Sequence, residues 1–232
     1  MARQKIMRKF ARWHIWLGWL VGVPILMWTV TGLVMVARPI ETVRGDHLRA
    51  DSEAEVLPGD LDLIARIGPD GDVVSVLQKM DHGEPIAIFT MRDGTQRRYS
   101  LATGTSEDIV MRDRALAVVA RDIRGGERVV SADFYAADDP PFDFRRPVPS
   151  WQVALEDGTH VYVNAQTGEI AAVRTRWWRV FDFMWGLHIM DLSEREDTSH
   201  PVLILFAALG VIGSLLGCLL MFRRRKARVK TA

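Results

Sequence analysis

Cysteine is nearly absent from this chain of 232 residues, since Cys218 is the only one. A disulfide within the chain, a CxxC redox pair and a CxxCH motif for covalent haem attachment each need two cysteines, so all three are excluded. A zinc or iron–sulfur centre held by a cluster of thiolates is excluded for the same reason.

Common catalytic motifs are also missing. The sequence contains no GxGxxG fingerprint, no P-loop, no flavin-binding pattern and no HExxH. It also contains no Ser/His/Asp set that we can recognise. Any electrons that the protein transfers must therefore come from a quinol or from another protein.

Charged side chains are absent from two long apolar runs, Ile15–Ala37 and Pro201–Phe222. At about 1.5 Å rise per residue, each run is long enough to cross a hydrocarbon core of about 30 Å. A wholly soluble protein is therefore excluded, and we expect two transmembrane helices. The first run is too long for the apolar part of a signal peptide and lacks a good cleavage site, so we expect it to be retained.

Acidic residues are absent from both ends of the chain. Residues 1–12 carry five cations and residues 223–232 carry six. These 11 leave 19 of the 30 basic residues, together with all 29 acidic ones, between the two ends, where the net charge is −10. The positive-inside rule then predicts a bacterial inner-membrane protein with both termini in the cytoplasm and a periplasmic central domain. Topology and anionic lipid explain the basic ends, so we expect no nucleic-acid partner.

Two stretches of the central region match at an offset of 64 residues. Asp93-Gly94-Thr95 returns as Asp157-Gly158-Thr159, and Thr103-Gly104 returns as Thr167-Gly168. Asp-Gly between alternating apolar residues predicts a tight hairpin turn. The expected elements also recur in one order, which gives an α-β-β-β unit used twice, unless the hairpins merely look alike. The first unit has a helix at 61–67, a strand at 72–78 and a hairpin of 86–91 with 96–101; the second has 112–123, 128–135, and 151–155 with 160–165.

The segment Trp177–Leu192 is aromatic and apolar but carries charges, which is typical of a helix at the membrane interface. We therefore predict a membrane protein of the α+β class, with an interfacial helix before the second crossing. Its segments are a basic cytoplasmic N-terminus (1–12), a first transmembrane helix (13–37), two periplasmic repeats (38–110 and 111–176), an interfacial helix and loop (177–199), a second transmembrane helix (200–222) and a basic cytoplasmic tail (223–232).

The stretch Trp151–Gly168, WQVALEDGTHVYVNAQTG, resembles a PepSY domain. His14-Ile-Trp-Leu-Gly18, Thr31-Gly32 and Leu187-His188 are similar to hallmarks of the PepSY-associated transmembrane family. Members of this group include haem-containing inner-membrane reductases of ferric siderophores, typically with four membrane helices and two periplasmic units per chain. The resemblance implies that this two-helix chain is a half-length form that binds haem b non-covalently and reduces ferric chelates in the periplasm.

Three of the six histidines lie at membrane depth or its boundary: His14, His188 and His200. Ionisable residues there are costly and have a partner or a task, and neutral imidazole is a common ligand of haem iron. Gly18 and Gly22 follow His14 at i+4 and i+8 on one helix face, which leaves room for a flat macrocycle. The alternative is a Gly-xxx-Gly packing motif beside an interfacial histidine.

His14 and His188 are expected near opposite faces of the membrane, which suits two haems that relay electrons outward. His200 is either a polar residue at a helix start or a group that replaces or completes the ligation by His188. The other histidines are expected in or beside loops and strands of the central domain and need no special role: His47, His82 and His160.

One chain offers no second histidine at the level of His14, because the second apolar run contains none and its cytoplasmic end has only Met221. We therefore expect a homodimer whose four helices bring His14 to its own copy, and His188 likewise. Small residues along one side of the second run are typical of a closely packed helix interface: Ala207, Gly210, Ser214 and Gly217.

A second hypothesis is a cofactor-free, membrane-anchored PepSY module for binding or regulation, in which His14 and His188 have packing roles. A third, a subunit of a larger transporter, is less favoured because neither apolar run contains an acid. Five arginines of the central domain are either solvated surface residues or attract an anionic chelate: Arg145, Arg146, Arg174, Arg176 and Arg179.

Overall fold

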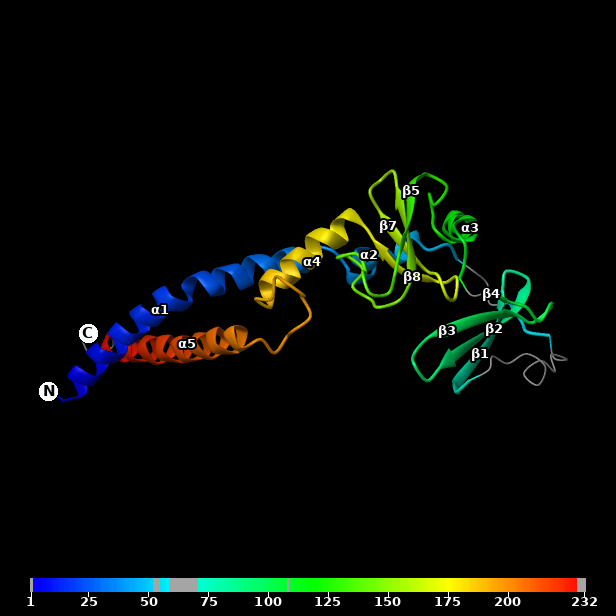
Figure 1. Cartoon of the computed structure of the whole chain (residues 1–232). Helices are drawn as coiled ribbons and strands as arrows, with labels where there is room; N and C mark the ends of the chain where they lie inside the picture. Colours follow the sequence, from blue (N-terminus) through cyan, green and yellow to red (C-terminus); the bar gives the residue numbers. More distant parts are fainter. Residues whose placement is uncertain (1, 52–54, 59–70, 108, 229–232) are drawn as a thin grey trace. The chain divides into compact units, whose positions relative to one another are not determined.

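The computed structural model describes residues 2–51, 55–58, 71–107 and 109–228, and the protein has an α+β fold (Figure 1). The chain divides into two compact units. Met1–Pro39 and Val180–Ala232 form a helical unit, and Ile40–Arg179 form a β-sheet unit. The two ends of the chain therefore share one unit, and the central region forms the other.

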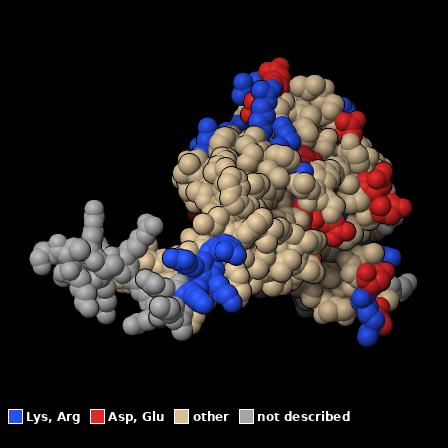
Figure 2. All heavy atoms as spheres, turned by 90° about the vertical axis from the view of Figure 1, so that its left-hand side faces the viewer, with Lys and Arg blue, Asp and Glu red and all other residues tan. Residues whose placement is uncertain are grey.

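Two long helices, α1 (Ala2–Met35) and α5 (Pro201–Arg228), pack against each other in the helical unit. Within them, Lys5–Met35 and Pro201–Phe222 are long and apolar enough to cross a membrane. The two predicted apolar helices are therefore present. Figure 2 shows Lys and Arg side chains gathered at the N-terminal end of α1. The exposed cations of its first turns are Lys5, Arg8, Lys9 and Arg12.

Glycines of α5 face α1 at close range. A Cβ atom at Gly210 would lie 3.9 Å from Cδ1 of Ile25, and one at Gly213 would lie 3.9 Å from Cβ of Leu17. Small residues of this kind let two membrane helices approach closely enough for their backbones to be near neighbours. A third helix, α4 (Arg176–His188), ends against α1, where the Trp28 indole N–H donates to the His188 carbonyl at 2.8 Å.

The β-sheet unit contains two antiparallel sheets of four strands, with the orders β1-β2-β3-β4 and β5-β6-β7-β8. The strands of the first sheet are β1 (Val73–Asp81), β2 (Glu84–Met91), β3 (Gln96–Ser100) and β4 (Ser106–Glu107). Those of the second are β5 (Val129–Tyr135), β6 (Ser150–Leu155), β7 (His160–Asn164) and β8 (Ile170–Arg174).

Both predicted Asp-Gly hairpins are present, and their turns are built alike. Gly94 and Gly158 have φ angles of 84° and 79°, which an Asp-Gly turn needs and which glycine adopts without strain. In each turn the aspartate accepts a hydrogen bond from the threonine amide two residues later, at 2.9 Å for Thr95 and 2.8 Å for Thr159. The turn chemistry therefore sets the register of β2 with β3 and of β6 with β7.

The predicted three-strand unit is wrong in its number of strands, because each sheet has a fourth. β4 spans only two residues, and β8 begins with four apolar residues in a row, so neither shows an alternation of apolar and polar side chains. β8 follows a second glycine turn, in which Gly168 has a φ of 78° and its amide donates to the Asn164 carbonyl. The helix predicted at 61–67 lies outside the described residues.

Helix α3 (Arg112–Asp122) covers the second sheet and completes the largest apolar core of the molecule's described part. Ala115, Val119 and Ile123 of this segment meet inward-facing residues of the sheet. The latter are Val153, Leu155, Val161, Val163 and Val173. The first sheet buries a smaller cluster, formed by Ala87, Phe89 and Leu101.

The start of the segment predicted as the first repeat packs instead with the second sheet. This stretch forms α2 (Ile40–Arg44) and a 3₁₀ helix, η1 (Asp46–Leu48). Val43 is fully buried, Gly45 lies against Val173, and Arg49 forms a β-bridge with Ile123. The predicted division into segments 38–110 and 111–176 therefore does not coincide with the packing of the two sheets, because residues 40–50 cover part of the second core. Periodicity did not reveal this, since the partners are more than 70 residues further along the chain.

Arg98 joins the first sheet to the second. Its side chain is 3% exposed and lies 2.6 Å from Oδ2 of Asp81 in the same sheet. Its other guanidinium nitrogen donates to the Thr167 carbonyl in the second sheet, at 3.1 Å. A buried cation needs such partners, since an unpaired charge away from water is strongly destabilising.

Replacing Arg98 by methionine (Arg98→Met) should lower the free energy of unfolding of the β-sheet unit by about 3 kcal/mol, because Asp81 keeps its burial and loses this cation. Arg97→Met makes the same change at the exposed neighbouring position, where a cost below about 0.5 kcal/mol is expected. Urea unfolding of the full chain in detergent, followed by circular dichroism, measures both. Equal stability of the two variants would contradict the role given to Arg98.

Candidate functional site

His14 lies where α1 packs against α5. Its Nδ1 atom is 3.0 Å from the backbone carbonyl oxygen of Gly213. Because a carbonyl can only accept, we assign the imidazole proton to Nδ1, which leaves a lone pair on Nε2. The backbone of α5 therefore both orients the His14 ring and sets its tautomer.

Gly217 makes room for that ring. A Cβ atom at this position would lie 2.9 Å from Cε1 of His14, closer than real Cβ contacts allow. Of the small residues predicted to form a packed side of α5, Gly210 and Gly217 do lie against α1, whereas Ala207 and Ser214 are exposed. The glycine at 217 thus serves the histidine as well as the helix contact.

An open groove of about 480 Å³ runs along α1 beside His14. The predicted face is present, because His14, Gly18 and Gly22 all line the groove. A Cβ atom at Gly18 or at Gly22 would meet no atom within 4 Å among the described residues. The other lining residues are apolar and come from the same helix: Ile15, Trp19, Val23 and Leu26. This wall of bare backbone and apolar side chains is therefore accessible to a flat, apolar group.

His188, the last residue of α4, is held by α1 at a different level. Its Nδ1 is 2.9 Å from the hydroxyl oxygen of Thr31, which is 2% exposed. That hydroxyl donates its only proton to the carbonyl oxygens of Met27 (2.7 Å) and Trp28 (3.2 Å). We assign the hydroxyl proton to these carbonyls, which makes Nδ1 of His188 the donor to Thr31 and leaves the lone pair on Nε2.

The two histidines stand at separate depths. The contact residue of His188 on α1 is Thr31, 17 positions after His14, which corresponds to about 25 Å along the helix. The structure therefore does not bring His14 and His188 together. Nδ1 of each ring has a hydrogen-bond partner, and Nε2 of neither ring forms a hydrogen bond within the part of the chain that the structure describes.

His200 differs from the other two. It immediately precedes α5, and its Nδ1 atom is enclosed with no hydrogen-bond partner among the described residues. A buried polar atom without a partner calls for an explanation such as a bound group or a water molecule. The turn that joins His188 to His200 is held by Asp191, which is 7% exposed. Hydrogen bonds from the Ser193 hydroxyl and several backbone amides lower the pKa of Asp191.

Sequence analysis did not find Thr31 or Gly213 as partners of the histidines. The sequence marked Thr31 only as part of a motif shared with a family, and it gave no sign of a role for Gly213. One signal was present in the sequence, since Thr31 is one of only two threonines in the charge-free run of α1. A hydroxyl in such an apolar run needs a hydrogen-bond partner, which lies either in its own helix or on a neighbouring element.

The β-sheet unit contains a second polar network, which the sequence did not indicate. Nδ1 of His160 lies 2.9 Å from Oδ2 of Asp143, and the hydroxyl of fully buried Tyr162 donates to Oδ1 of the same carboxylate. Burial alone would raise the pKa of Asp143, but the hydrogen bonds from His160 and Tyr162 hold it below its usual value. Burial and the neighbouring carboxylate also raise the pKa of Tyr162.

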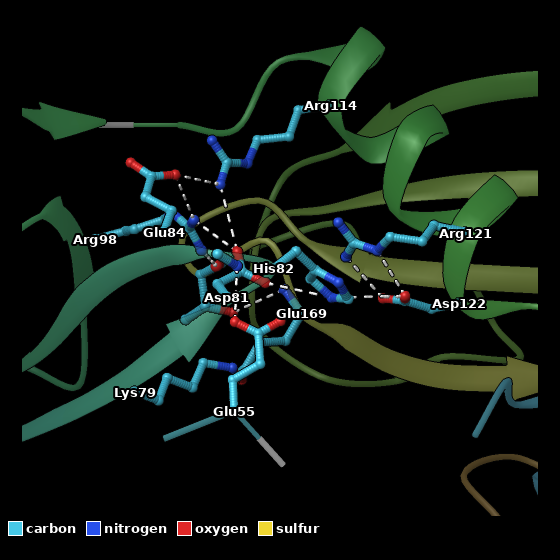
Figure 3. Close-up of polar contacts among 12 residues, drawn as sticks. Glu55, Lys79, Asp81, His82, Glu84, Arg98, Arg114, Arg121, Asp122 and Glu169 are labelled. Atoms are coloured by element: carbon cyan, nitrogen blue, oxygen red, sulfur yellow. Dashed lines mark hydrogen bonds and ion pairs between the residues drawn. The ribbon is translucent and has the colours of Figure 1, made fainter. Parts of the chain in front are cut away.

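A third cluster lies between the two sheets (Figure 3), and it includes His82. Nε2 of His82 is 3.7 Å from the carboxylates of Asp81 and of Asp122 at the end of α3. Lys79 pairs with Glu169 at 2.5 Å. Acids and bases alternate here, and no described group of three or more His, Cys, Asp or Glu residues could hold a metal ion. The cluster therefore links the sheets. His47 is exposed on η1.

Two apolar membrane helices with a β-sheet unit inserted between them define a membrane protein of the α+β class. Residues 11–232 match the model of a family described as the PepSY-associated TM region, and the chain belongs to this family. The match confirms the resemblance found in the sequence. No curated protein and no solved structure matches the chain significantly.

The lowered pKa of Asp143 predicts a specific pH dependence of stability. Stability from this carboxylate is present above its unfolded pKa of about 3.9 and is lost as the pH falls through the lower folded value. Asp143→Asn should therefore be less stable than the unchanged protein at pH 7, and the gap should narrow below about pH 4. Thermal unfolding of the full chain in detergent at several pH values measures this difference. Asp139→Asn, at an exposed position, is the matched control, and a gap that stays constant with pH would contradict the prediction.

Proposed function

We propose that the protein binds haem b non-covalently and transfers electrons through the membrane to ferric chelates, such as siderophores. The observation that carries this proposal is the hydrogen bonding of the Nδ1 atoms of two histidines in the helical unit. In both His14 and His188, Nδ1 has a hydrogen-bond partner and Nε2 has none among the described residues, so Nε2 is the ligand atom that we propose. Metal-bound histidines are held in the same way, with the other ring N–H donated to a carbonyl or a similar acceptor.

The residues present fit a haem at each of two levels. At the first level His14 would ligate iron, and the bare backbone of Gly18 and Gly22 would accept the macrocycle. At the second level His188 would ligate iron, with His200 as the alternative or additional ligand because its Nδ1 lacks a partner among the described residues. Bound haem would supply reversible one-electron chemistry, which no side chain at these positions provides.

The chain's own residues would position the ligands and exclude water. The Gly213 carbonyl and the Thr31 hydroxyl orient the two imidazoles and raise the basicity of Nε2 by accepting hydrogen bonds. The Trp28 indole N–H donates a hydrogen bond to the backbone carbonyl of His188 and so fixes the position of that residue's backbone. The apolar wall formed by Ile15, Trp19 and Leu26 would surround one macrocycle with low-dielectric material.

The proposed reaction is the one-electron reduction of a chelated ferric ion. Chelators with hard oxygen ligands hold ferric iron more tightly than ferrous iron, so reduction would release the metal. The basic ends and the net charge of −10 between them support a bacterial inner-membrane location with both termini in the cytoplasm and the β-sheet unit in the periplasm. A quinol or another protein would donate the electrons.

We also propose that two copies form the working assembly. The groove beside His14 has one wall, because all of its described lining residues come from α1. A second copy would close the groove and supply a second His14, and the resulting four-helix arrangement would likewise pair His188 with its copy.

A dithionite-reduced minus air-oxidised absorption spectrum, with pyridine haemochrome quantitation, tests the proposal on the purified full chain. The expected result is sharp α and Soret bands and about one or more haems per chain. The same preparation should have a mass in detergent corresponding to two chains. His14→Ala and His188→Ala should each lose part of the haem, His200→Ala shows whether that residue contributes, and His160→Ala in the β-sheet unit is the matched control.

The two parts of this test fail separately. A colourless protein, expressed with ample haem, would overturn the electron-transfer proposal and favour the cofactor-free PepSY binding or regulatory module. A monomeric protein replete with haem would overturn the dimer alone.

Thr31→Val should leave most of the haem bound and raise the reduction potential at the His188 level by roughly 40 mV. This value corresponds to the loss of one hydrogen bond of about 1 kcal/mol that makes the imidazole more basic. Thr31→Ser should restore the original potential. Thr29→Val is the matched control, because the Thr29 hydroxyl is exposed and bonds only to its own helix at Ile25. A spectroelectrochemical titration measures all four proteins, and equal potentials for Thr31→Val and Thr29→Val would contradict the role given to Thr31.

A further inference from the structure

The chain enters the β-sheet unit at α2 and leaves it after β8, and these two elements are in contact. α1 ends at Met35 and α2 begins at Ile40, so the first connection has four residues and spans at most about 14 Å. The second connection is helix α4 itself, which begins at Arg176 soon after β8 ends at Arg174 and continues past Arg179, the last residue of the β-sheet unit. α2 contacts β8. We call α2, β8 and the first turn of α4 the tethered edge, since the chain enters and leaves the β-sheet unit there.

Five arginines gather at the tethered edge, on segments 142–146 and 174–179. The first segment lies against β8 and α4. Arg174 donates to the Asp143 carbonyl at 2.8 Å, Arg146 donates to the Ala171 carbonyl at 3.2 Å, and Arg179 donates to the Gly158 carbonyl. The complete set is Arg145, Arg146, Arg174, Arg176 and Arg179. The only acid in these two segments is Asp143, whose carboxylate contacts His160 and Tyr162 and lies 3.8 Å from Nη1 of Arg179.

The charge of this edge is opposite to that of the rest of the unit. Outside the two segments, residues 40–179 carry 12 basic and 23 acidic residues. An anionic bilayer would repel such an acidic unit unless the edge that faces it were basic. The arginines gather at the edge where the chain passes between the β-sheet unit and the helical unit.

Aromatic side chains are interleaved with the arginines. The Arg174 guanidinium lies 4.1 Å from the ring centre of Trp178, and that of Arg145 lies 5.9 Å from the same ring. Arg145 also lies 5.4 Å from the ring centre of Phe142, which is 54% exposed. Trp178 is buried, so Phe142 supplies the exposed aromatic surface beside these cations. An exposed aromatic residue beside cations is typical of protein surfaces at the lipid headgroup level. This combination favours a lipid surface over a small soluble anion as the partner.

We propose that the arginines of the tethered edge bind the phosphate groups of anionic glycerophospholipids in the leaflet next to the β-sheet unit. Guanidinium groups suit this partner because they bind phosphate oxygens in a bidentate way and stack on aromatic rings. Phe142 would enter the headgroup layer beside them. The binding would hold the β-sheet unit at a set height over the membrane, and it requires no cofactor.

The test uses the full chain in nanodiscs made of phosphatidylcholine alone or with added phosphatidylglycerol. Backbone hydrogen exchange of segments 142–146 and 174–179 should slow at least fivefold when phosphatidylglycerol is present, since one arginine near an anionic surface corresponds to roughly a fivefold change. Arg146→Gln combined with Arg176→Gln should remove most of this protection. Both residues are exposed. Arg92→Gln combined with Arg97→Gln, also exposed and far along the chain in the first sheet, is the control with the same charge change.

Three outcomes would overturn the proposal. They are equal exchange in the two lipid compositions, equal loss of protection in the test and control variants, and equal protection by inorganic phosphate added to phosphatidylcholine nanodiscs. The last result would identify a site for soluble anions instead. Unchanged exchange of β6 and β7 in every variant confirms that the unit is folded, so a loss of protection can be assigned to the missing arginines.

Discussion

The close approach of α5 to α1 is the constraint on which the helical unit depends. Glycines at 210, 213 and 217 bring the backbone of α5 to the surface of α1, where the Gly213 carbonyl accepts a hydrogen bond from His14. A larger residue at 217 would collide with the imidazole. The same glycine contacts therefore pack the two helices and orient His14, and both effects would be lost together if α5 moved away from α1.

At the second histidine level, side chains of α1 hold the histidine in place of a backbone carbonyl of α5. His188 lies at the end of α4, and its position depends on the buried Thr31 hydroxyl and on the Trp28 indole, both on α1. α1 is thus the common support of both levels, whereas α5 and α4 each complete one of them. The β-sheet unit keeps its own core and its own ion pairs, and its arginine-rich edge lies where the chain leaves and re-enters the helical unit.

Local chemistry predicted the parts of the structure that depend on neighbours in sequence. The charge-free runs, the two Asp-Gly hairpins, α3 and the alignment of Gly18 and Gly22 with His14 are all confirmed, because each needs only residues within a few positions. β4 has too few residues to show a pattern, and β8 lacks an alternation of apolar and polar side chains. The packing of residues 40–50 on the second core, the pairing of His14 with Gly213 and that of His188 with Thr31 were not predictable, since the hydrogen-bonded histidine partners are 199 and 157 positions apart.

A single helix that carries both levels also restricts how their separation can vary. His14 must keep facing α5, and Thr31 must keep facing α4, while each added residue turns α1 by about 100°. Inserting one residue between them would rotate one contact away from its partner even though it lengthens the helix by only about 1.5 Å. Related chains adapted to thicker or thinner membranes should therefore differ in this stretch by about one whole helical turn, or about 5.4 Å, rather than by single residues.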